Sequence, residues 1–504
     1  MKVHLAGFNV DTKVLEELQD NNPRRLDITP EVISAAYARI SRDPRPIEQI
    51  RQDARKEVEG ARKSNSTIIF KMGHHSVAEH AVFNLDIVGV SRLAMEEVEK
   101  FRLCSYTEKS QRYITLEIDF IIPEEIENSS CKDLFIKTIR RQNEAYGRFF
   151  DVLKRQVFNK YPDLAKDPKK HGLLEGWAKE DARYITSLAT SSQVGQTVNA
   201  RVFELLLRRF ASSKLSEVRN LGAMLYDEVA QVAPSIVIFH QANDRDNKTY
   251  PQLRDLSGQL CSVSKASEAV NTGEDVELVE YTSGGDDIVA ASLLHASSNI
   301  DYQRCISIVK SLSREDKLNI FKISWKNLQF YDSLLREFEY ANLTFNLVVS
   351  SACFGQLKRH RMSTITGQEY DVSLGVTIPE SIKEAGEQGC FMAMVDETNR
   401  AYEEIKRDAP EAAAYVLTNS HRKRVLMKVN ARELYHISRL REDAHAQWDI
   451  QNISRNMVAK AKEVMPLTFG LACGKDKYNE IYHNTFGCLT KVVKAILPEV
   501  RKIK

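Results

Sequence analysis

The feature that most constrains this chain is an internal repeat. Residues 197–201 read TVNAR, and residues 428–432 read KVNAR. Each segment is followed by an amphipathic helical pattern and then by a proline, 35 positions after Asn199 and 36 positions after Asn430. A repeat of this length is the mark of a duplicated domain and not of a short solenoid unit.

A second match lies upstream of each segment. Residues 79–85 (EHAVFNL) resemble residues 339–345 (EYANLTF), and both alternate apolar and polar residues as a half-buried strand does. Each half of the chain mixes helical patterns with a few short strands, without a regular β-α-β alternation. We therefore predict an α+β fold with two tandem domains, each an antiparallel or mixed sheet packed with helices.

The domain boundaries follow from changes in composition. Residues 243–275 are rich in Asp, Asn, Ser, Thr and Gly, and residues 276–281 then read as a new opening strand, with a helix over 286–294. We predict a first domain at 1–240 with a helical insertion at 131–176, a linker at 241–275, a second domain at 276–470, and a C-terminal helical extension at 471–504 with a helical pattern over 489–497.

Charge and cysteine content exclude several classes of protein. The chain has 71 basic and 69 acidic residues, a net charge of +2, so no overall field favours long nucleic acid or an anionic membrane. Eight Cys without a CxxC pair indicate buried thiols in a reducing compartment. The start of the chain does not resemble a signal peptide, and no stretch approaches the roughly 18 apolar residues of a membrane span. We expect a soluble, cytoplasmic protein with no membrane or nucleic-acid partner.

The strongest chemical cluster is residues 358–361 (KRHR). Arg presents a planar fork of donors, so such a run suits a phosphate or pyrophosphate. Taken alone, the run is more often a solvated helix face. Here it follows an apolar stretch, residues 345–357, and a charged group at the end of a buried segment favours a functional role.

A second cluster spans residues 102–113 and combines hydroxyls, a carboxylate and two guanidiniums. Hydroxyls and Arg together suit a nucleotide, although the same pattern also occurs on an exposed strand. The His-rich segment 74–80 does not match HExxH, so we expect no metal site and prefer a structural role, with His capping or bonding at a strand entrance. No phosphate-binding loop or nucleophile motif is present. The residues alone therefore indicate anion binding, with a nucleotide as one candidate.

Together, these residues resemble the flavin-dependent thymidylate synthases. The family signature is Arg-His-Arg, two residues, Ser, four residues, Ser, one residue and Arg. A His, a Ser or Thr and Glu-His precede it, and an Ala-Arg and an Asn-Ala-Arg follow it. The resemblance covers both halves of the chain. It implies reductive methylation of deoxyuridine monophosphate (dUMP) to dTMP, with FAD as cofactor and NADPH and methylenetetrahydrofolate as co-substrates.

The signature is divided between the two copies. In the first copy, Arg-His-Arg has become KFR at 100–102, and Phe210 stands where the family has a helix Arg. The first copy keeps His74, Ser76, Glu79, His80, Ser105, Glu108, Ser110, Arg112, Arg183, Asn199 and Arg201. The second copy keeps Gln356, Arg359, His360, Arg361, Asn430, Arg432, His436 and Arg441. It lacks any Arg from 362 to 380, and Ala414 and Leu334 replace a family Arg and His.

In the family, the nucleotide lies between two subunits, and the two copies here have complementary losses. We predict one composite nucleotide site made of Glu108, Ser110, Arg112 and Arg183 from the first copy with Gln356, Arg359 and Arg441 from the second. Arg441, Arg112 and Ser110 are the predicted catalytic residues, which orient and polarise the base and are not nucleophiles. The reciprocal site is not expected to bind nucleotide. The family is usually homotetrameric, so we expect a homodimer that forms a pseudo-tetramer with two nucleotide sites.

Two flavin positions are consistent with the resemblance. One set is Arg102, Asn199, Arg201 and His436, and the other is His74, Ser76, Arg359, His360, Arg361, Asn430 and Arg432. The asparagines and arginines among them also have a structural interpretation, as helix caps and ion pairs. The alternative function is a catalytically silent paralogue that binds nucleotide or flavin as a partner or sensor. An RNA-binding protein is disfavoured by the neutral charge balance and the lack of an aromatic stacking module.

Overall fold

The computed structural model describes residues 1–20, 28–40, 42–112, 119–263 and 273–490. The chain divides into two compact units. Unit 1 comprises Met1–Asn271 and Gly375–His421, and unit 2 comprises Thr272–Leu374 and Arg422–Lys504. The segment Gly375–His421 belongs by sequence to the second repeat but folds within unit 1. Each unit is described by itself.

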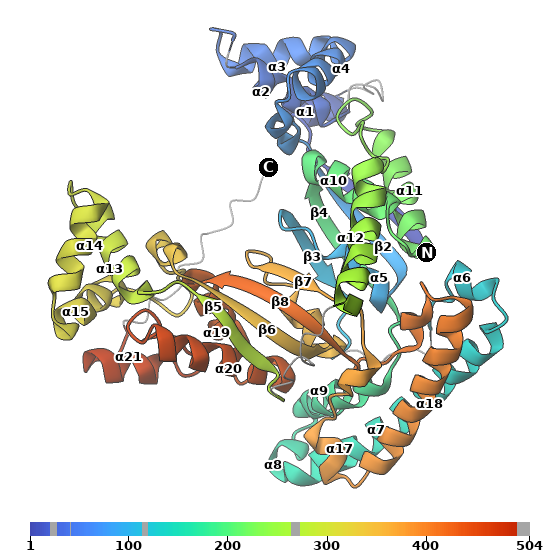
Figure 1. The fold of residues 1–504 in the computed structure, drawn as a ribbon. Coiled ribbons are helices and arrows are strands. Elements are labelled where there is room, and N and C mark those ends of the chain that lie inside the picture. The colour runs from blue at the N-terminus through green and yellow to red at the C-terminus, as the bar shows by residue number, and fades with distance from the viewer. Residues whose placement is uncertain (21–27, 41, 113–118, 264–272, 491–504) are drawn as a thin grey trace. The chain divides into compact units, whose positions relative to one another are not determined.

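Unit 1 contains a four-stranded antiparallel sheet in the order β1-β2-β4-β3 (Figure 1). Along β2 the side chains of Phe83, Leu85 and Ile87 are buried, and the residues between them are exposed. This period of two is the pattern expected of a strand with one solvated face. The strands are β1 (Lys2–Phe8), β2 (Val82–Ser91), β3 (Cys104–Glu108) and β4 (Ser191–Asn199).

Helices cover one face of this sheet. The helix α10 begins where the side chain of Asn199 accepts a hydrogen bond from the backbone N–H of Val202 at 2.9 Å, a typical N-cap.

A separate small core of Val, Ile and Ala holds the N-terminal helices together. The helices of this part are α1 (Thr12–Asp20), α2 (Glu31–Arg39), α3 (Ile47–Lys56), α4 (Val58–Ser66), η2 (Thr67–Lys71), η3 (His75–His80), α5 (Arg92–Val98), α10 (Ala200–Ala211), α11 (Ser216–Ala230) and α12 (Asp244–Val263).

A second group of helices in unit 1 joins the two repeats. The side chain of Gln142 on α7 donates to Thr398 Oγ1 on α18 at 2.8 Å and to the carbonyl of Val416 at 2.9 Å, and α7 runs beside α18 (Figure 1). The helices of this group are α6 (Glu124–Glu127), α7 (Lys132–Lys160), α8 (Pro162–Ala165), η4 (Pro168–Lys170), α9 (His171–Ala182), η5 (Arg183–Ile185), α17 (Glu380–Glu384), α18 (Gln388–Asp408) and η8 (Ala413–Val416).

Equivalent backbone segments of the two repeats pair with each other in unit 1. Ser187 and Thr418 form an antiparallel bridge, and Thr418 lies 231 positions after Ser187, as Asn430 does after Asn199. The N–H of Leu188 donates to the carbonyl of Leu417 at 2.8 Å, and the N–H of Asn419, which is equivalent to Leu188, donates to the carbonyl of Thr186 at 3.0 Å. The exchange is reciprocal, so the contact has the two-fold character of a homodimer interface.

Unit 2 repeats the sheet of unit 1. Its four antiparallel strands have the order β5-β6-β8-β7, and they are β5 (Val276–Tyr281), β6 (Asn342–Ser350), β7 (Thr364–Gly367) and β8 (Arg422–Asn430). Trp325, Phe338 and Tyr435 belong to the buried core between sheet and helices. The helices are α13 (Gly285–Ala296), α14 (Tyr302–Ser311), α15 (Arg314–Trp325), η6 (Arg336–Tyr340), α16 (Ser351–Leu357), η7 (Val372–Leu374), α19 (Ala431–Arg441), α20 (Trp448–Val464) and α21 (Tyr478–Phe486).

The fold class is the predicted one, and the strand over 276–281 and the helix near 286–294 are present as β5 and α13. The strands predicted at 79–85 and 339–345 begin later, at Val82 and Asn342, because the residues before them form the 3-10 turns η3 and η6. The segment 241–275, predicted as a linker, contains the five-turn helix α12. Most of the pattern over 489–497 lies outside the described residues.

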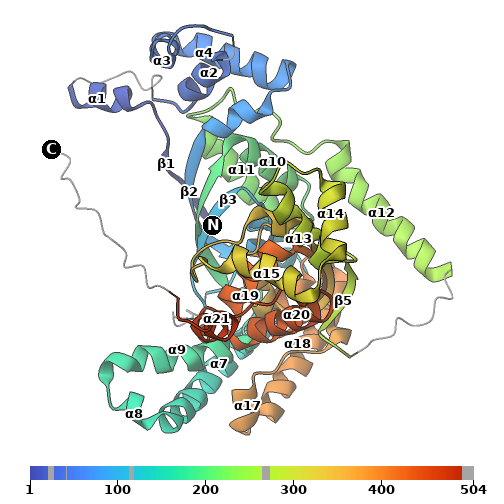
Figure 2. The same cartoon turned by 90° about the vertical axis from the view of Figure 1, so that its left-hand side faces the viewer.

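Little of α12 contacts the rest of unit 1. Its first turn is held by Asp246, which pairs with Arg208 at 2.7 Å, whereas the following turns are exposed and extend away from α10 (Figure 2). Turn-forming residues and polar composition therefore did not prevent a helix in this segment. Within the described ranges, no helix is both long and apolar enough to cross a membrane.

Candidate functional site

Two predicted residues of the second copy, Gln356 and His360, contact Arg441, the last residue of α19, in unit 2. The Nε of Arg441 donates to His360 Nε2 at 2.9 Å, and its Nη1 donates to Gln356 Oε1 at 2.9 Å. Gln356 belongs to α16, and His360 follows that helix by three residues. The end of α16 and the turn that follows it thus hold the guanidinium at the end of α19, about 80 positions later in the chain.

The protonation state of His360 decides how this cluster works. Burial lowers the pKa of His360 well below its usual value, and the positive charge of Arg441 lowers it further. The ring is therefore neutral near pH 7, and its Nε2 is the acceptor for Arg441. Its Nδ1 then carries the proton and lies 3.4 Å from Glu433 Oε1. His360 orients Arg441 and leaves the positive charge on the guanidinium.

The basic run 358–361 is only partly a surface feature. Lys358 and His360 are buried, Arg359 is exposed, and Arg361 is half-buried. The solvated-face interpretation therefore fails for two of the four residues. The run begins at Lys358, the C-cap of α16, so the C-terminal end of this helix places the charges at the edge of the core.

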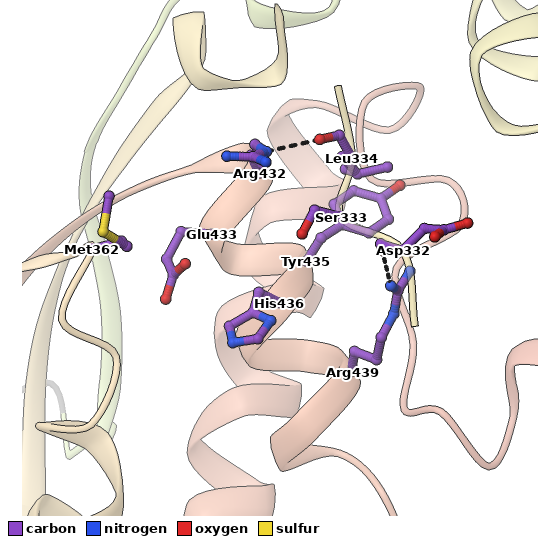
Figure 3. Close-up of a pocket in the computed structure, with 9 residues that line it drawn as sticks. All are labelled: Asp332, Ser333, Leu334, Met362, Arg432, Glu433, Tyr435, His436 and Arg439. Atoms are coloured by element: carbon purple, nitrogen blue, oxygen red, sulfur yellow. Dashed lines mark hydrogen bonds between the residues drawn. The ribbon is translucent and has the colours of Figure 1, made fainter. Parts of the chain in front are cut away.

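A cavity of about 210 Å³ lies beside α19 in unit 2 (Figure 3). Arg432 donates to the carbonyl of Leu334 at 2.7 Å, and Arg439 donates to the carbonyl of Asp332. Figure 3 shows His436 and Glu433 on the side of α19 that faces Met362. The complete lining is Asp332, Ser333, Leu334, Met362, Arg432, Glu433, Tyr435, His436 and Arg439.

The predicted residues of the first copy form an ion-pair cluster in unit 1. Arg112 donates through Nε to Glu180 Oε2, and the backbone N–H of Arg112 donates to Ser110 Oγ at 3.2 Å. Glu108 accepts a hydrogen bond from Ser192 at 3.3 Å and lies 3.6 Å from Arg92. Arg92 and Arg112 thus each face a carboxylate, as partly or fully buried cations must.

Arg183 is a second buried cation of this cluster, besides Arg92. Its side chain is enclosed, its Nε donates to the carbonyl of Glu180 at 3.2 Å, and burial lowers the pKa of its guanidinium. Its Nη2 is buried and has no hydrogen-bond partner within the described residues. The side chain of Asn419 contacts this residue from the second repeat by donating to the carbonyl of Arg183 at 3.1 Å.

The predicted flavin residues of the first copy lie nearer the surface. His74 and Ser76 are exposed, and His74 occupies the N-cap position of η3 without a side-chain cap bond, so the capping role considered for it is wrong. Arg102 is exposed, and Arg201 pairs with Glu79. Asn199 caps α10, as Asn430 caps α19 by accepting from the N–H of Glu433 at 2.8 Å. Their side-chain oxygens therefore have structural roles.

Comparison with known proteins identifies the family of this chain. The family model described as "Thymidylate synthase complementing protein" matches the chain twice, at residues 26–235 and 277–467. Together the two matches cover well over half of the chain. The chain belongs to this family.

Relatives of two kinds are similar to this thymidylate synthase-like chain. A flavin-dependent thymidylate synthase of Clostridium tetani is 29% identical over 41% of the chain and 80% of its own length. A UPF0159 protein of Chlamydia pneumoniae is 24% identical over 82% of the chain and 81% of its own length, and one of Thermoplasma acidophilum is 24% identical over 87% and 94%. The two-copy length is therefore shared with UPF0159 proteins, whereas the named synthase matches a single copy.

Among solved structures, a UMP/dUMP methylase, PolB, from Streptomyces cacaoi bound with 5-Br dUMP matches with a TM-score of 0.32. It is 17% identical over 40% of this chain and 95% of that one.

In the first copy of this family member, an aromatic contact stands where the second copy has a polar one. Phe101 and Phe210 correspond to His360 and Arg441, and their ring centroids lie 6.1 Å apart at an interplanar angle of 69°. Phe210 is buried. Both members of the polar pair have been replaced together, so the first copy packs this position as apolar core and has no guanidinium there.

In unit 2, a lysine occupies the region that is equivalent to the surroundings of Arg112 in unit 1. Lys423 on β8 is buried, and its Nζ lies 4.2 Å from the ring centroid of Phe354 and 4.3 Å from that of Tyr370. Lys423 is equivalent to Ser192, which bonds Glu108 in the first copy. A cation held between two rings is a stable internal arrangement, so this position of unit 2 is occupied by its own side chain.

Within each unit, some of the predicted residues of that copy lie together. Gln356, His360, His436 and Arg441 are neighbours in unit 2, and Glu108, Ser110, Arg112 and Arg183 lie in unit 1. Sequence reasoning missed Arg92, Glu180 and Asn419, which contact the unit 1 set. It also missed Gln111, which contacts Asn419. Gln111 lies within the cluster 102–113 and was detectable there, whereas nothing in the sequence links Asn419 to Arg183.

Proposed function

We propose that this protein is a flavin-dependent thymidylate synthase that methylates dUMP to dTMP reductively, with methylenetetrahydrofolate and NADPH as co-substrates. The observation that carries the proposal is the complementary retention of site residues. The acceptor and guanidinium set of the first copy is intact in unit 1, and the Arg441 cluster is intact in unit 2. Their opposite losses are at Phe210, which is buried in the core, and at Ala414, which is half-buried.

In this proposal both units contribute residues to one nucleotide. Glu108, Ser110, Arg112 and Arg183 come from unit 1, and Gln356, Arg359 and Arg441 come from unit 2. The guanidiniums bind the dianionic phosphate and polarise the base, and each charge-assisted hydrogen bond contributes roughly 1.5–3 kcal/mol. Ser110 is a binding hydroxyl. Two chains form a pseudo-tetramer with one nucleotide per chain.

The cavity of unit 2 suits part of an FAD molecule. Two guanidiniums, Arg432 and Arg439, and the imidazole of His436 line it, and this donor set fits a pyrophosphate or a flavin carbonyl. Arg361 and Asn430 would hold the same group from the neighbouring elements. When bound, FAD supplies the redox chemistry of the transfer. The residues of the chain orient the rings and exclude water.

One observation supports a second candidate, a silent paralogue that binds nucleotide or flavin. Leu334 lines the cavity at the place where the family has a His, and Lys100 and Phe101 replace Arg and His in the first copy. These changes remove polar contacts to flavin without disturbing the Arg441 cluster. Under this alternative the protein binds dUMP but does not release the hydrogen at C5.

The deciding experiment measures flavin and turnover on the full chain. We expect a yellow protein, or one that becomes yellow with added FAD, and release of tritium from dUMP labelled at C5 when NADPH and methylenetetrahydrofolate are present. Arg441→Ala should abolish this release. Arg148→Ala removes an exposed Arg that pairs with Glu387 at 2.8 Å on the helical part of unit 1 and should leave the rate unchanged. Binding of dUMP with no release in any condition identifies the silent paralogue.

A further inference from the structure

A second cavity, of about 180 Å³, lies in unit 1 among α7, α9 and α17. The helices α7 and α9 belong to the first repeat, and α17 belongs by sequence to the second. None of the residues assigned above to nucleotide or flavin lines it. The complete lining is Leu153, Gln156, Val157, Lys160, Tyr161, Trp177, Ala178, Asp181, Ser381 and Glu384.

Two aromatic rings and several apolar side chains form one part of this cavity. The rings of Tyr161 and Trp177 meet edge to face, with centroids 5.1 Å apart at an interplanar angle of 65°. Both residues remain partly exposed, at 40% and 38%, so a ligand can reach them from solvent. The face of a phenol or indole ring attracts a cation, and Leu153 and Ala178 beside them suit an apolar stem.

The charged groups of the lining leave one net negative charge. Glu384 accepts from Lys160 Nζ at 3.1 Å, and this pair lies near the surface. Asp181 is the second carboxylate, and its Oδ2 accepts a hydrogen bond from Ser381 Oγ at 2.5 Å. Two carboxylates and one ammonium therefore line the same cavity.

Gln156 carries the observation that indicates a ligand. Its Nε2 donates to Glu384 Oε2 at 3.3 Å, and an ionised carboxylate only accepts hydrogen bonds, so the orientation of the amide is fixed. The other amide atom, Oε1, is buried and has no hydrogen-bond partner within the described residues. A buried acceptor without a partner costs roughly 1–3 kcal/mol. The group that completes this cavity is therefore a hydrogen-bond donor.

Charge and size narrow the class of ligand. An anion would meet two carboxylates and the oxygen of Gln156, and the single ammonium, Lys160, is already paired with Glu384. A purely apolar ligand would leave the Gln156 oxygen without a partner. Pockets for drug-sized ligands measure roughly 300–1,000 Å³, so this cavity takes a smaller molecule or the end of a longer one.

We propose that the cavity binds a primary ammonium group on a short alkyl stem. The ammonium donates to Gln156 Oε1, Asp181 supplies the opposite charge, and the rings of Tyr161 and Trp177 enclose the cation and its stem. Such a group occurs in a free alkylamine and in the side chain of a lysine from a partner protein. The site goes beyond the proposed function and does not rest on it.

The first test titrates the full wild-type chain with n-butylammonium, 1-butanol and butyrate, which share a stem and differ in the charge of the head group. Saturation-transfer NMR of the probe and tryptophan fluorescence measure binding. We expect n-butylammonium to bind about tenfold or more tightly than the other two probes, since a hydrogen bond to a charged group contributes roughly 1.5–3 kcal/mol. Equal binding of the three probes, or binding of none, would overturn the inference and leave Gln156 Oε1 to a water molecule.

A fourth probe, Nα-acetyl-lysine amide, distinguishes the two sources of the ammonium. Affinity similar to that of n-butylammonium would show that a lysine side chain on a peptide backbone enters the cavity. Binding of n-butylammonium alone would restrict the site to free amines. Both results support an ammonium site.

Two variants assign the contacts. Gln156→Met removes the acceptor and should weaken n-butylammonium binding about tenfold or more. Trp177→Leu removes one ring and should weaken it about twofold to thirtyfold. Gln231→Met is the matched control, because Gln231 is an exposed glutamine of unit 1 whose Nε2 donates to the carbonyl of Asp227 at 3.2 Å. It should leave the affinity unchanged.

A third variant is expected to act in the opposite direction. Lys160→Met removes a positive charge beside the ligand and should strengthen n-butylammonium binding about twofold to fivefold at low salt. A cavity with only a structural role gives no such gain. Unchanged or weaker binding in Lys160→Met, or unchanged binding in Gln156→Met in protein that melts as the wild type does, would also overturn the inference.

Discussion

Arg441 and His360 are joined by a hydrogen bond of 2.9 Å from Nε to Nε2, and the equivalent pair in the first repeat is Phe210 with Phe101. The contact between the two positions is kept, while its chemistry has changed from polar to aromatic. A single replacement would remove the partner of a half-buried guanidinium or of a buried imidazole, so a paired change is the less costly one. The second repeat therefore carries a guanidinium at this position, and the first repeat does not.

Arg441→Ala should lower dUMP affinity roughly 10-fold to 150-fold, the loss of one charge-assisted interaction. Phe210→Arg should leave dUMP affinity nearly unchanged, because the site it would rebuild lacks the other guanidiniums. It should however lower the melting temperature, because Phe210 is buried and packs closely against Gly222, where an added Cβ would lie 3.0 Å from Phe210 Cβ. Calorimetry and thermal melting measure the two effects. Equal losses of affinity in both variants would contradict a one-sided site.

The double variant His360→Phe with Arg441→Phe copies the first repeat into the second. Each single change should destabilise unit 2 by about 1–3 kcal/mol, because it removes the hydrogen-bond partner of the buried imidazole or of the half-buried guanidinium. The double variant should recover part of this loss, with a coupling energy of about 1 kcal/mol or more in a double-mutant cycle. Its dUMP affinity should stay as low as that of the Arg441→Phe variant. Additive melting effects would show that the two positions are independent.

Lys423→Ser introduces the residue that occupies the equivalent position of the first repeat. It should lower the melting temperature of unit 2, since it removes a cation from between two rings, worth roughly 1–2 kcal/mol, and leaves a void. The number of dUMP molecules bound per chain should remain one. A second equivalent of bound dUMP would show that Lys423 alone blocks a competent site.

His421 should make unit 1 less stable in acid. Its Nδ1 accepts from the N–H of Thr418 at 2.9 Å, its Nε2 lies 2.9 Å from Asn399 Oδ1, and burial lowers its pKa to about 4. The unfolded chain takes up a proton near pH 6.5, whereas the folded chain does so only near pH 4, so stability is full above pH 6.5 and falls as the pH drops below it. The loss is about 1.4 kcal/mol at pH 5.5.

The variant His421→Gln isolates this contribution. We expect it to be less stable than the wild type at pH 7.5, because the hydrogen bond between His421 Nε2 and Asn399 Oδ1 is lost. Its melting temperature should fall less than that of the wild type between pH 7.5 and pH 5.5. His360, whose pKa is also lowered by burial, gives a loss in the same direction in both proteins. Parallel pH profiles for the wild type and the variant would contradict the assignment to His421.

The duplication could be predicted from the sequence because the signals that reveal it are local. The TVNAR and KVNAR segments each place an Asn at a strand end, where its side chain caps the following helix, and a cap needs only a few adjacent residues. The strand alternation in β2 has the same local origin. Local signals failed at 79–85 and 339–345, where 3-10 turns precede the strands, and at α12, where a composition typical of a linker forms a helix.

The sequence by itself determined the two-copy architecture, the family and which guanidiniums each repeat keeps. The tertiary structure decided that residues 375–421 fold with the first repeat, that Ser187 pairs with Thr418, and that Asn419 contacts Gln111 and Arg183. Those contacts join residues more than two hundred positions apart, and no spacing or periodicity encodes them. They arise because buried amides and carbonyls must find partners wherever the packing of the core brings them together.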